Sequence, residues 1–161
     1  MDKAKKETAI LNAILEGYST GNFDHLFAFM TDDYHHASFW VVEVIRGKEN
    51  AKAYYSGKGE TMRSSGSLAK GKYVKILSAP SRVRPNGVFR NGVRMLEDPV
   101  FLHRTDEGKK AVLLIQNTNG QDVATIAIPT MTKDGLLKQL LLTDPKYYTV
   151  DECVLEREKN Q

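Results

Sequence analysis

The sequence predicts an α+β domain in which helices pack on one face of a curved, mainly antiparallel sheet. Apolar residues recur with a helical period in the first third of the chain, whereas most of the second half follows a strand pattern. Two-residue turn signals, Asn119-Gly120 and Asp134-Gly135, separate three of the later segments, as is typical of antiparallel hairpins. Helices followed by a run of hairpin-connected strands favour this fold class.

Three helices are expected before residue 64. The first is amphipathic and ends at Gly21, and its apolar face consists of Ile10, Leu11, Ile14, Leu15 and Tyr18. Asn22 can cap a short second helix, whose apolar side consists of Phe23, Leu26, Phe27 and Met30. The third helix begins in the segment KENAKAYY (48–55), and Gly57 and Gly59 weaken its later part.

Strands are expected between the second and third helices and again after residue 70. Residues 34–44 are mostly aromatic, β-branched or small, without proline or glycine, which predicts one strand. The short carboxylates of Asp32-Asp33 are expected in the turn before it. Later strands are predicted at 72–84, 100–105, 110–118, 121–131 and 136–143, after a small and polar surface loop at 64–72. We expect one domain over residues 1–150 and a frayed or helical tail over residues 151–161.

Length and composition exclude several classes. A chain of 161 residues favours a single domain, and 41% hydrophobic with 27% charged residues excludes a disordered or fibrous protein. The single cysteine, Cys153, cannot form an intrachain disulfide, and no apolar run is long enough for a signal sequence or a membrane span. We therefore expect a cytoplasmic protein that binds no membrane.

A cluster of arginines lies in the segment SRVRPNGVFRNGVR. Its members are Arg82, Arg84, Arg90 and Arg94. Together they could bind phosphate or an acidic partner, although a solvated strand end explains them as well. Only Phe89 interleaves as an aromatic residue, and a net charge of +3 is too small to indicate nucleic acid, so no nucleic-acid partner is expected.

Three phrases of the sequence resemble a known superfamily in their order and spacing. They are YSTGNFDHLFAFMTDDYHHASFW, RGKENAKAYY and NGQDVATIAIPTMTKDGLLKQLLLTD. Together they are similar to the nuclear transport factor 2-like superfamily, which includes SnoaL-like polyketide cyclases and ketosteroid isomerases. The resemblance implies three N-terminal helices packed on a strongly curved sheet that forms a cone, a cystatin-like roll. It implies little about activity, because this fold hosts many unrelated functions.

The resemblance also allows a test of one known activity. Ketosteroid isomerases use an aspartate base together with a tyrosine and a protonated aspartate that stabilise the oxyanion. Their three positions fall on Ser38, Ala13 and Ala127 in this sequence. None of these side chains can perform the corresponding role, so isomerase chemistry of that type is not expected.

By the same register, one face of the strands looks into the cone. Its predicted pocket residues are His36, Ser38, Trp40, Tyr55, Leu114, Gln116, Thr125, Ala127, Leu140 and Leu142. This mainly apolar set suits a small apolar or aromatic molecule, although a cone filled by its own side chains is an equal alternative. His36 is the candidate catalytic residue, as a general base; the alternative is a histidine hydrogen-bonded to a ligand or a tyrosine.

No metal or cofactor is expected. Asp33 and His35 share the opposite strand face and could supply two metal ligands, but a third is not identified unless folding brings His25 or His103 near. The sequence also contains no glycine-rich nucleotide loop and no zinc spacing.

The outer face of the predicted sheet is apolar. Its residues are Leu113, Ile115, Ala124, Ile126, Ile128, Leu137 and Leu141. An exposed apolar face of this size predicts a protein interface, and we expect a homodimer through the sheet. Two functions remain open: a small-molecule-binding protein, with a cofactor-free isomerase, cyclase or dehydratase-like activity as one form of it, and a non-catalytic interaction or dimerisation domain.

Overall fold

The computed structural model describes residues 2–38, 41–78, 89–90, 93–94 and 106–155. The helices are α1 (Lys3–Thr20), α2 (Asp24–Phe27), α3 (Lys48–Ser65) and the 3₁₀ turn η2 (Pro145–Tyr147). The strands are β1 (Met30–Ser38), β2 (Val41–Arg46), β3 (Lys70–Ser78), β4 (Phe89–Arg90), β5 (Val93–Arg94), β6 (Lys110–Thr118), β7 (Gln121–Met131), β8 (Leu137–Thr143) and β9 (Thr149–Glu152).

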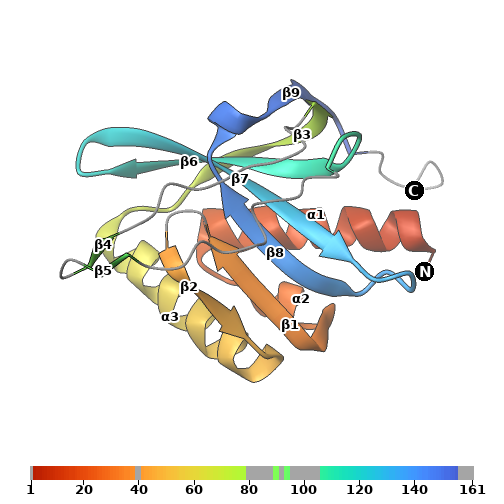
Figure 1. Ribbon diagram of the computed structural model, residues 1–161, viewed down its shortest axis with the longest axis horizontal. Helices are drawn as coiled ribbons and strands as arrows, with labels where there is room; N and C mark the ends of the chain where they lie inside the picture. The colour runs from red at the N-terminus through yellow and green to blue at the C-terminus, as the bar shows by residue number, and fades with distance from the viewer. Residues whose placement is uncertain (1, 39–40, 79–88, 91–92, 95–105, 156–161) are drawn as a thin grey trace.

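Seven of these strands form one curved sheet in the order β2-β1-β8-β7-β6-β3-β9, and β4 pairs with β5 separately. The pairs within the large sheet are antiparallel except β1 with β8, which are parallel. In Figure 1, α1 lies across the sheet on its far side, and the β6–β7 hairpin extends beyond the rest of the sheet. The predicted α+β class, with helices on one side of a curved sheet, is confirmed.

Helix α1 follows the predicted pattern. Its N-terminus is capped by Asp2, whose side chain accepts a hydrogen bond of 2.8 Å from the backbone N–H of Lys5. It ends at Gly21, which takes the left-handed conformation with φ of 82°. The second helix is shorter than predicted. It ends at Phe27, and β1 begins at Met30, so Asp32 and Asp33 lie within a strand rather than in a turn.

Helix α3 is longer than predicted and continues through both glycines to Ser65. One of these glycines, Gly59, lies where two chain segments cross closely. A Cβ atom on Gly59 would lie 2.0 Å from the carbonyl oxygen of Gly21, so the contact between the end of α1 and α3 admits no side chain. Nothing lies within 4 Å of the corresponding position on Gly57. Tertiary contact therefore outweighs the low helix propensity of glycine at residue 59.

The single strand predicted over residues 34–44 is wrong, because this segment contributes to two antiparallel strands. His35 pairs with Arg46 and Ser38 with Val41, and the register shifts between His36 and Ser38. The segment lacks the glycine, asparagine or proline that normally marks a hairpin turn, so the reversal has no local signal.

The pairing of the closing hairpins follows the two-residue turns predicted at Asn119-Gly120 and Asp134-Gly135. Leu114 pairs with Thr125 and Val112 with Ala127 across the Asn119-Gly120 turn, in which both residues have positive φ. Between β7 and β8, Leu140 pairs with Pro129, as a two-residue turn at Asp134-Gly135 predicts. Proline has no backbone N–H to donate to a strand ladder, so a bulge is expected at Pro129, whereas the register shifts one residue later, between Thr130 and Met131.

This bulge changes the orientation of one predicted outer-face residue. Thr130 pairs with Gln139 and Met131 with Leu137, so Lys138 is the extra residue on β8. Leu137 is fully buried in the core between sheet and helices, not on the outer face as predicted. An extra residue in a strand reverses the alternation of faces before it, which explains the correction.

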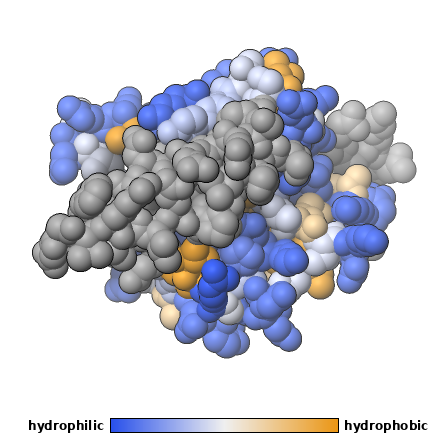
Figure 2. Space-filling model, in the orientation of Figure 1, coloured by the Kyte–Doolittle hydropathy of each residue, from blue (hydrophilic) through white to orange (hydrophobic). Residues whose placement is uncertain are grey.

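The outer face holds a second, smaller hydrophobic cluster. Ile126, Ile128 and Leu141 belong to it and are at most 2% exposed in the single chain. The predicted exposed apolar face therefore does not hold for these three residues. In the view of Figure 2, hydrophilic side chains cover most of the visible described surface, and hydrophobic ones appear at separate places. The homodimer remains a prediction, which the mass of the protein in solution would test.

The C-terminal segment also differs from expectation where it is described. Asp151 and Glu152, predicted to begin a frayed or helical tail, belong to β9, which pairs antiparallel with β3. Leu155 then returns to the main core and is 6% exposed. Several other predictions lie outside the described residues: the second half of the strand at 72–84, the strand at 100–105, and Arg82 and Arg84.

Candidate functional site

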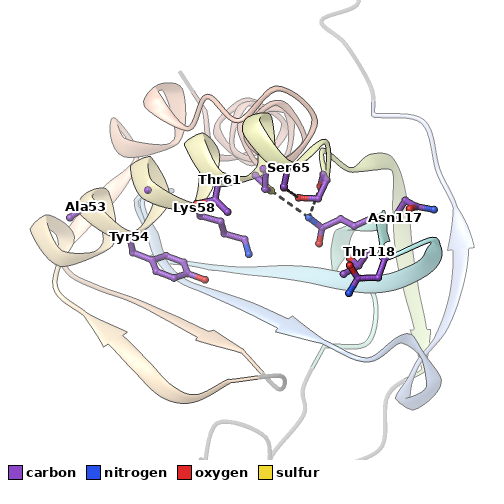
Figure 3. A pocket seen from close by; sticks show the side chains of 12 residues that line it. Ala53, Tyr54, Lys58, Thr61, Ser65, Asn117 and Thr118 are labelled. Atoms are coloured by element: carbon purple, nitrogen blue, oxygen red, sulfur yellow. Dashed lines mark hydrogen bonds between the residues drawn. The ribbon is translucent and has the colours of Figure 1, made fainter.

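A pocket with a volume of about 730 Å³ lies between α3 and the end of the β6–β7 hairpin. We call it the α3–hairpin pocket. Figure 3 shows Tyr54 and Lys58 extending from α3 towards the sheet, and Asn117 and Thr118 on the hairpin. The described residues that line it are Ala53, Tyr54, Gly57, Lys58, Thr61, Met62, Ser65, Ser67, Gln116, Asn117, Thr118 and Asn119.

The helical wall follows from the spacing of residues on α3. Tyr54, Lys58, Thr61 and Ser65 are separated by three or four positions, which places them on one side of the helix. Gly57 leaves open space beside them, because it has no side chain. This side of α3 thus offers an aromatic ring, an ammonium group and hydroxyl groups to a single concave surface.

The hairpin wall is held in place by hydrogen bonds. The Gln116 side-chain amide donates to the carbonyl oxygen of Ser67 at 3.0 Å and to the sulfur of Met62 at 3.4 Å. Further along the hairpin, the Asn117 amide donates to the carboxylate of Asp122 at 3.1 Å. The Gln116 bonds tie β6 to the C-terminal end of α3, and the Asn117 bond joins the two strands of the hairpin.

Lys58 is the charged residue of this site. It is partly buried in the pocket wall, and desolvation lowers the pKa of its ammonium group. Within the described part of the chain it forms no ion pair, whereas Lys52 on the same helix pairs with Glu49 at 3.7 Å. The charge of Lys58 is therefore uncompensated by a carboxylate among the described residues.

A buried network of aromatic polar groups adjoins the pocket. The hydroxyl groups of Tyr34 and Tyr55 lie 2.6 Å apart, and the Tyr55 hydroxyl lies 2.6 Å from Nδ1 of His36. A phenol is the better donor and a neutral imidazole nitrogen the better acceptor. We therefore assign the order Tyr34 to Tyr55 to His36, which leaves the proton of His36 on Nε2.

His36 is held in its neutral form. Burial lowers its pKa to about 3, and the nearby charges of Lys58 and His35 act in the same direction. A general base works best when its pKa lies near the working pH, so this imidazole is poorly suited to accept a proton at neutral pH. The geometry favours a hydrogen-bonding role for His36 over the catalytic role considered from sequence.

One ring links the network to the pocket. The ring centroids of His36 and Tyr54 are 5.1 Å apart, and Tyr54 also lines the pocket. Nε2 of His36 is buried and has no hydrogen-bond partner among the described residues, and the same holds for the Tyr18 hydroxyl. Orphaned buried polar atoms are uncommon and mark positions where a water molecule or a ligand atom would be stabilised.

The residues predicted from sequence as a pocket lie mostly inside the core. Tyr55, Leu114, Ala127, Leu140 and Leu142 pack together in the main hydrophobic cluster. His36, Ser38 and Thr125 are also buried. Gln116 is partly exposed, and among the described members of the predicted set it alone also lines the α3–hairpin pocket. Trp40 lies outside the described residues.

Sequence reasoning missed the helical wall of the pocket. Lys58 and Thr61 follow Tyr54 at the spacing of one helix face, but the predicted weakening of the helix at Gly57 and Gly59 hid this pattern. Reading the helix through both glycines would have placed a lysine beside the predicted cone.

The described residues contain neither a cluster of metal-ligating side chains nor a membrane-spanning helix. No group of three or more histidine, cysteine, aspartate or glutamate side chains among them lies close enough to hold a metal ion. No helix in the described ranges is long and apolar enough to cross a membrane. Asp33 and His35 lie on β1, and His103 lies outside these ranges.

Comparison with known proteins supports the fold. No protein-family model and no curated protein matches the sequence. Among solved structures, an uncharacterised bacterial protein with a cystatin-like fold from Silicibacter pomeroyi DSS-3 superposes with a TM-score of 0.50 and 12% identity, over 83% of this chain and 72% of that chain. A protein of unknown function with a cystatin-like fold from Methylobium petroleophilum PM1 gives 0.50 and 8% identity, over 98% of this chain and 82% of that one. An NTF2-like protein of unknown function from Cytophaga hutchinsonii ATCC 33406 gives 0.46 and 11% identity, over 87% and 91%.

The chain therefore has the cystatin-like fold, as the resemblance in its sequence implied. At 8% and 12% identity the two superpositions at a TM-score of 0.50 show the fold alone. Function has to be argued from the pocket and its residues.

Proposed function

We propose that the protein binds a small organic molecule in the α3–hairpin pocket. The observation that carries this proposal is the pocket itself, about 730 Å³ in volume, lined by both apolar and hydrogen-bonding side chains. Its volume lies in the range of small-molecule sites, and such sites combine apolar walls with a few placed polar groups. The mixed lining supports a ligand with both an apolar body and polar substituents.

Binding without catalysis is the form of this function that the geometry favours. The low pKa of His36 makes it a weak general base at neutral pH. The isomerase positions hold Ser38, Ala13 and Ala127, whose buried side chains carry neither a carboxylate nor a phenol. The interaction-domain alternative relied on an exposed apolar outer face, and Ile126 and Ile128 are buried within the chain. The α3–hairpin pocket is therefore the better-supported site.

The experiment is a thermal-shift screen of small molecules with two tryptophan variants as a matched pair. A ligand that binds the folded state raises its melting temperature by an amount that grows with the logarithm of the ratio of ligand concentration to Kd. Ala53 lines the pocket, whereas the nearby Ser56 is exposed and does not. We expect Ala53→Trp to abolish the shift produced by each hit and Ser56→Trp to retain it. Hits that shift both variants equally would place binding elsewhere and refute the proposal.

A further inference from the structure

The charge of the α3–hairpin pocket indicates the class of ligand. Among the described residues that line it, Lys58 alone carries a charge, and the others are apolar, hydroxyl or amide side chains and one glycine. The nearby acid on the hairpin, Asp122, accepts a hydrogen bond from Asn117 and is exposed to solvent. As far as its lining is described, the concave surface therefore carries positive charge at Lys58 alone.

The position of Lys58 makes this charge available to a ligand. Figure 3 shows its side chain extending from α3 into the space between helix and sheet, away from the solvent-exposed side of the helix. An ammonium group held in a partly desolvated place without a counter-ion is destabilised, and desolvation lowers its pKa accordingly. A bound anion would stabilise the ammonium group and so compensate for the hydration that it loses on burial.

The surroundings of Lys58 restrict the kind of anion. Phosphate-binding and nucleic-acid sites normally use arginine forks, backbone N–H groups or several cations, and the described lining offers one cation. Tyr54 lies one turn away on the same helix face and presents an aromatic ring, while Ala53 and Met62 add apolar surface. One ammonium group beside an aromatic and apolar wall suits a single negative charge on an apolar body.

We propose that the ligand is an organic monoanion, such as a carboxylate or sulfonate on an aromatic or apolar body, and that Lys58 is its counter-ion. This inference deepens the proposed function and depends on the same pocket. The charged group lies at the ammonium nitrogen of Lys58, the body rests against Tyr54, and the amide and hydroxyl groups of the hairpin wall face its polar substituents.

The test uses two fluorescent probes that share one ring skeleton. Anilinonaphthalenesulfonate carries one negative charge, and phenylnaphthylamine is its neutral counterpart. Fluorescence titration of the full chain gives an affinity for each. Lys58→Met removes the charge and keeps the apolar stem, and Lys52→Met is the control, because Lys52 is on the same helix but does not line the pocket.

We expect Lys58→Met to weaken sulfonate binding by about ten-fold or more, the usual effect of losing a charged hydrogen bond, and to leave the neutral probe within about three-fold. Lys52→Met should change neither affinity. If both probes bind and neither responds to Lys58→Met, the charge assignment is refuted while ligand binding stands. If neither probe binds the unmodified protein, the charge assignment and the proposed pocket function are refuted together.

Discussion

At the scale of single residues, His36 couples the stability of the fold to pH. Its pKa is about 3 in the folded protein, against about 6.5 for an exposed histidine. Between these two values the unfolded chain binds more protons than the folded one, so the free energy of unfolding rises with pH. The contribution of His36 is complete above about pH 6.5 and is lost as the pH falls towards about 3.

This linkage predicts the behaviour of His36→Gln, which keeps a hydrogen-bonding side chain but cannot titrate. Between about pH 7.5 and about pH 5, the unmodified protein should lose about 2 kcal/mol of unfolding free energy through His36, and the variant should lose about that much less. Urea denaturation at both pH values measures the difference. His25 provides the control, because its bond to Glu16 raises its pKa, so His25→Gln should alter the pH dependence in the opposite direction. Equal losses in the unmodified protein and in His36→Gln would contradict the prediction.

At the scale of elements, the contact between Gly21 and Gly59 sets how closely α3 approaches the end of α1. Arg63, one turn after Gly59, donates a hydrogen bond of 2.8 Å to the carbonyl oxygen of Gly21 and fastens the same contact. The backbone contact at Gly21 and Gly59 therefore sets the approach of α3 to the end of α1, while Tyr55 packs α3 into the main core.

Two alanine substitutions on α3 should have opposite effects. Gly59→Ala places a methyl group against the Gly21 carbonyl and should reduce the unfolding free energy by about 1–3 kcal/mol. Gly57→Ala meets no neighbour and should increase it by about 0.5–1 kcal/mol, because alanine is the better helix former. Chemical denaturation of both variants checks this. A Gly59→Ala protein as stable as the unmodified chain would show that the helices separate without cost.

The elements that sequence predicted well are those with local signals. Asn119-Gly120 fixes the pairing of β6 with β7, because a two-residue turn allows one register. The elements predicted poorly depend on distant contacts. The reversal between β1 and β2 has no typical turn residue to signal it. Helix α3 continues through Gly59 because the backbone of Gly21 packs against it. The bulge at Lys138, which turns Leu137 to the other face of the sheet, lies one residue from the position expected from Pro129. The helical wall of the pocket escaped prediction for the same reason, since the pocket joins α3 to a hairpin about 50 residues later.

At the scale of the whole molecule, the last described residues pack into the same hydrophobic core as the first helix. Leu155 belongs to the same hydrophobic cluster as Ile10 and Leu11 of α1, and β9 before it covers the edge of the sheet at β3. The segment expected to be a tail is therefore part of the fold as far as it is described.

Two neighbouring residues allow this role to be tested. Leu155→Ala should reduce the unfolding free energy by about 2–4 kcal/mol, because it removes a buried side chain and leaves a cavity. Val154 is 88% exposed, so Val154→Ala should change stability by about 0.5 kcal/mol or less. Thermal or urea denaturation compares the two, and similar effects would show that Leu155 contributes no more than its exposed neighbour.

The parallel pairing of β1 with β8 has a consequence for synthesis on the ribosome. Strand β1 ends at Ser38, and its partner begins at Leu137, so about a hundred residues are translated in between. At usual translation rates, the nascent hairpin of β1 and β2 waits roughly 5–20 s with one edge unpaired. An unpaired strand edge invites pairing with other chains. For that interval, the edge of β1 that later pairs with β8 is exposed to aggregation.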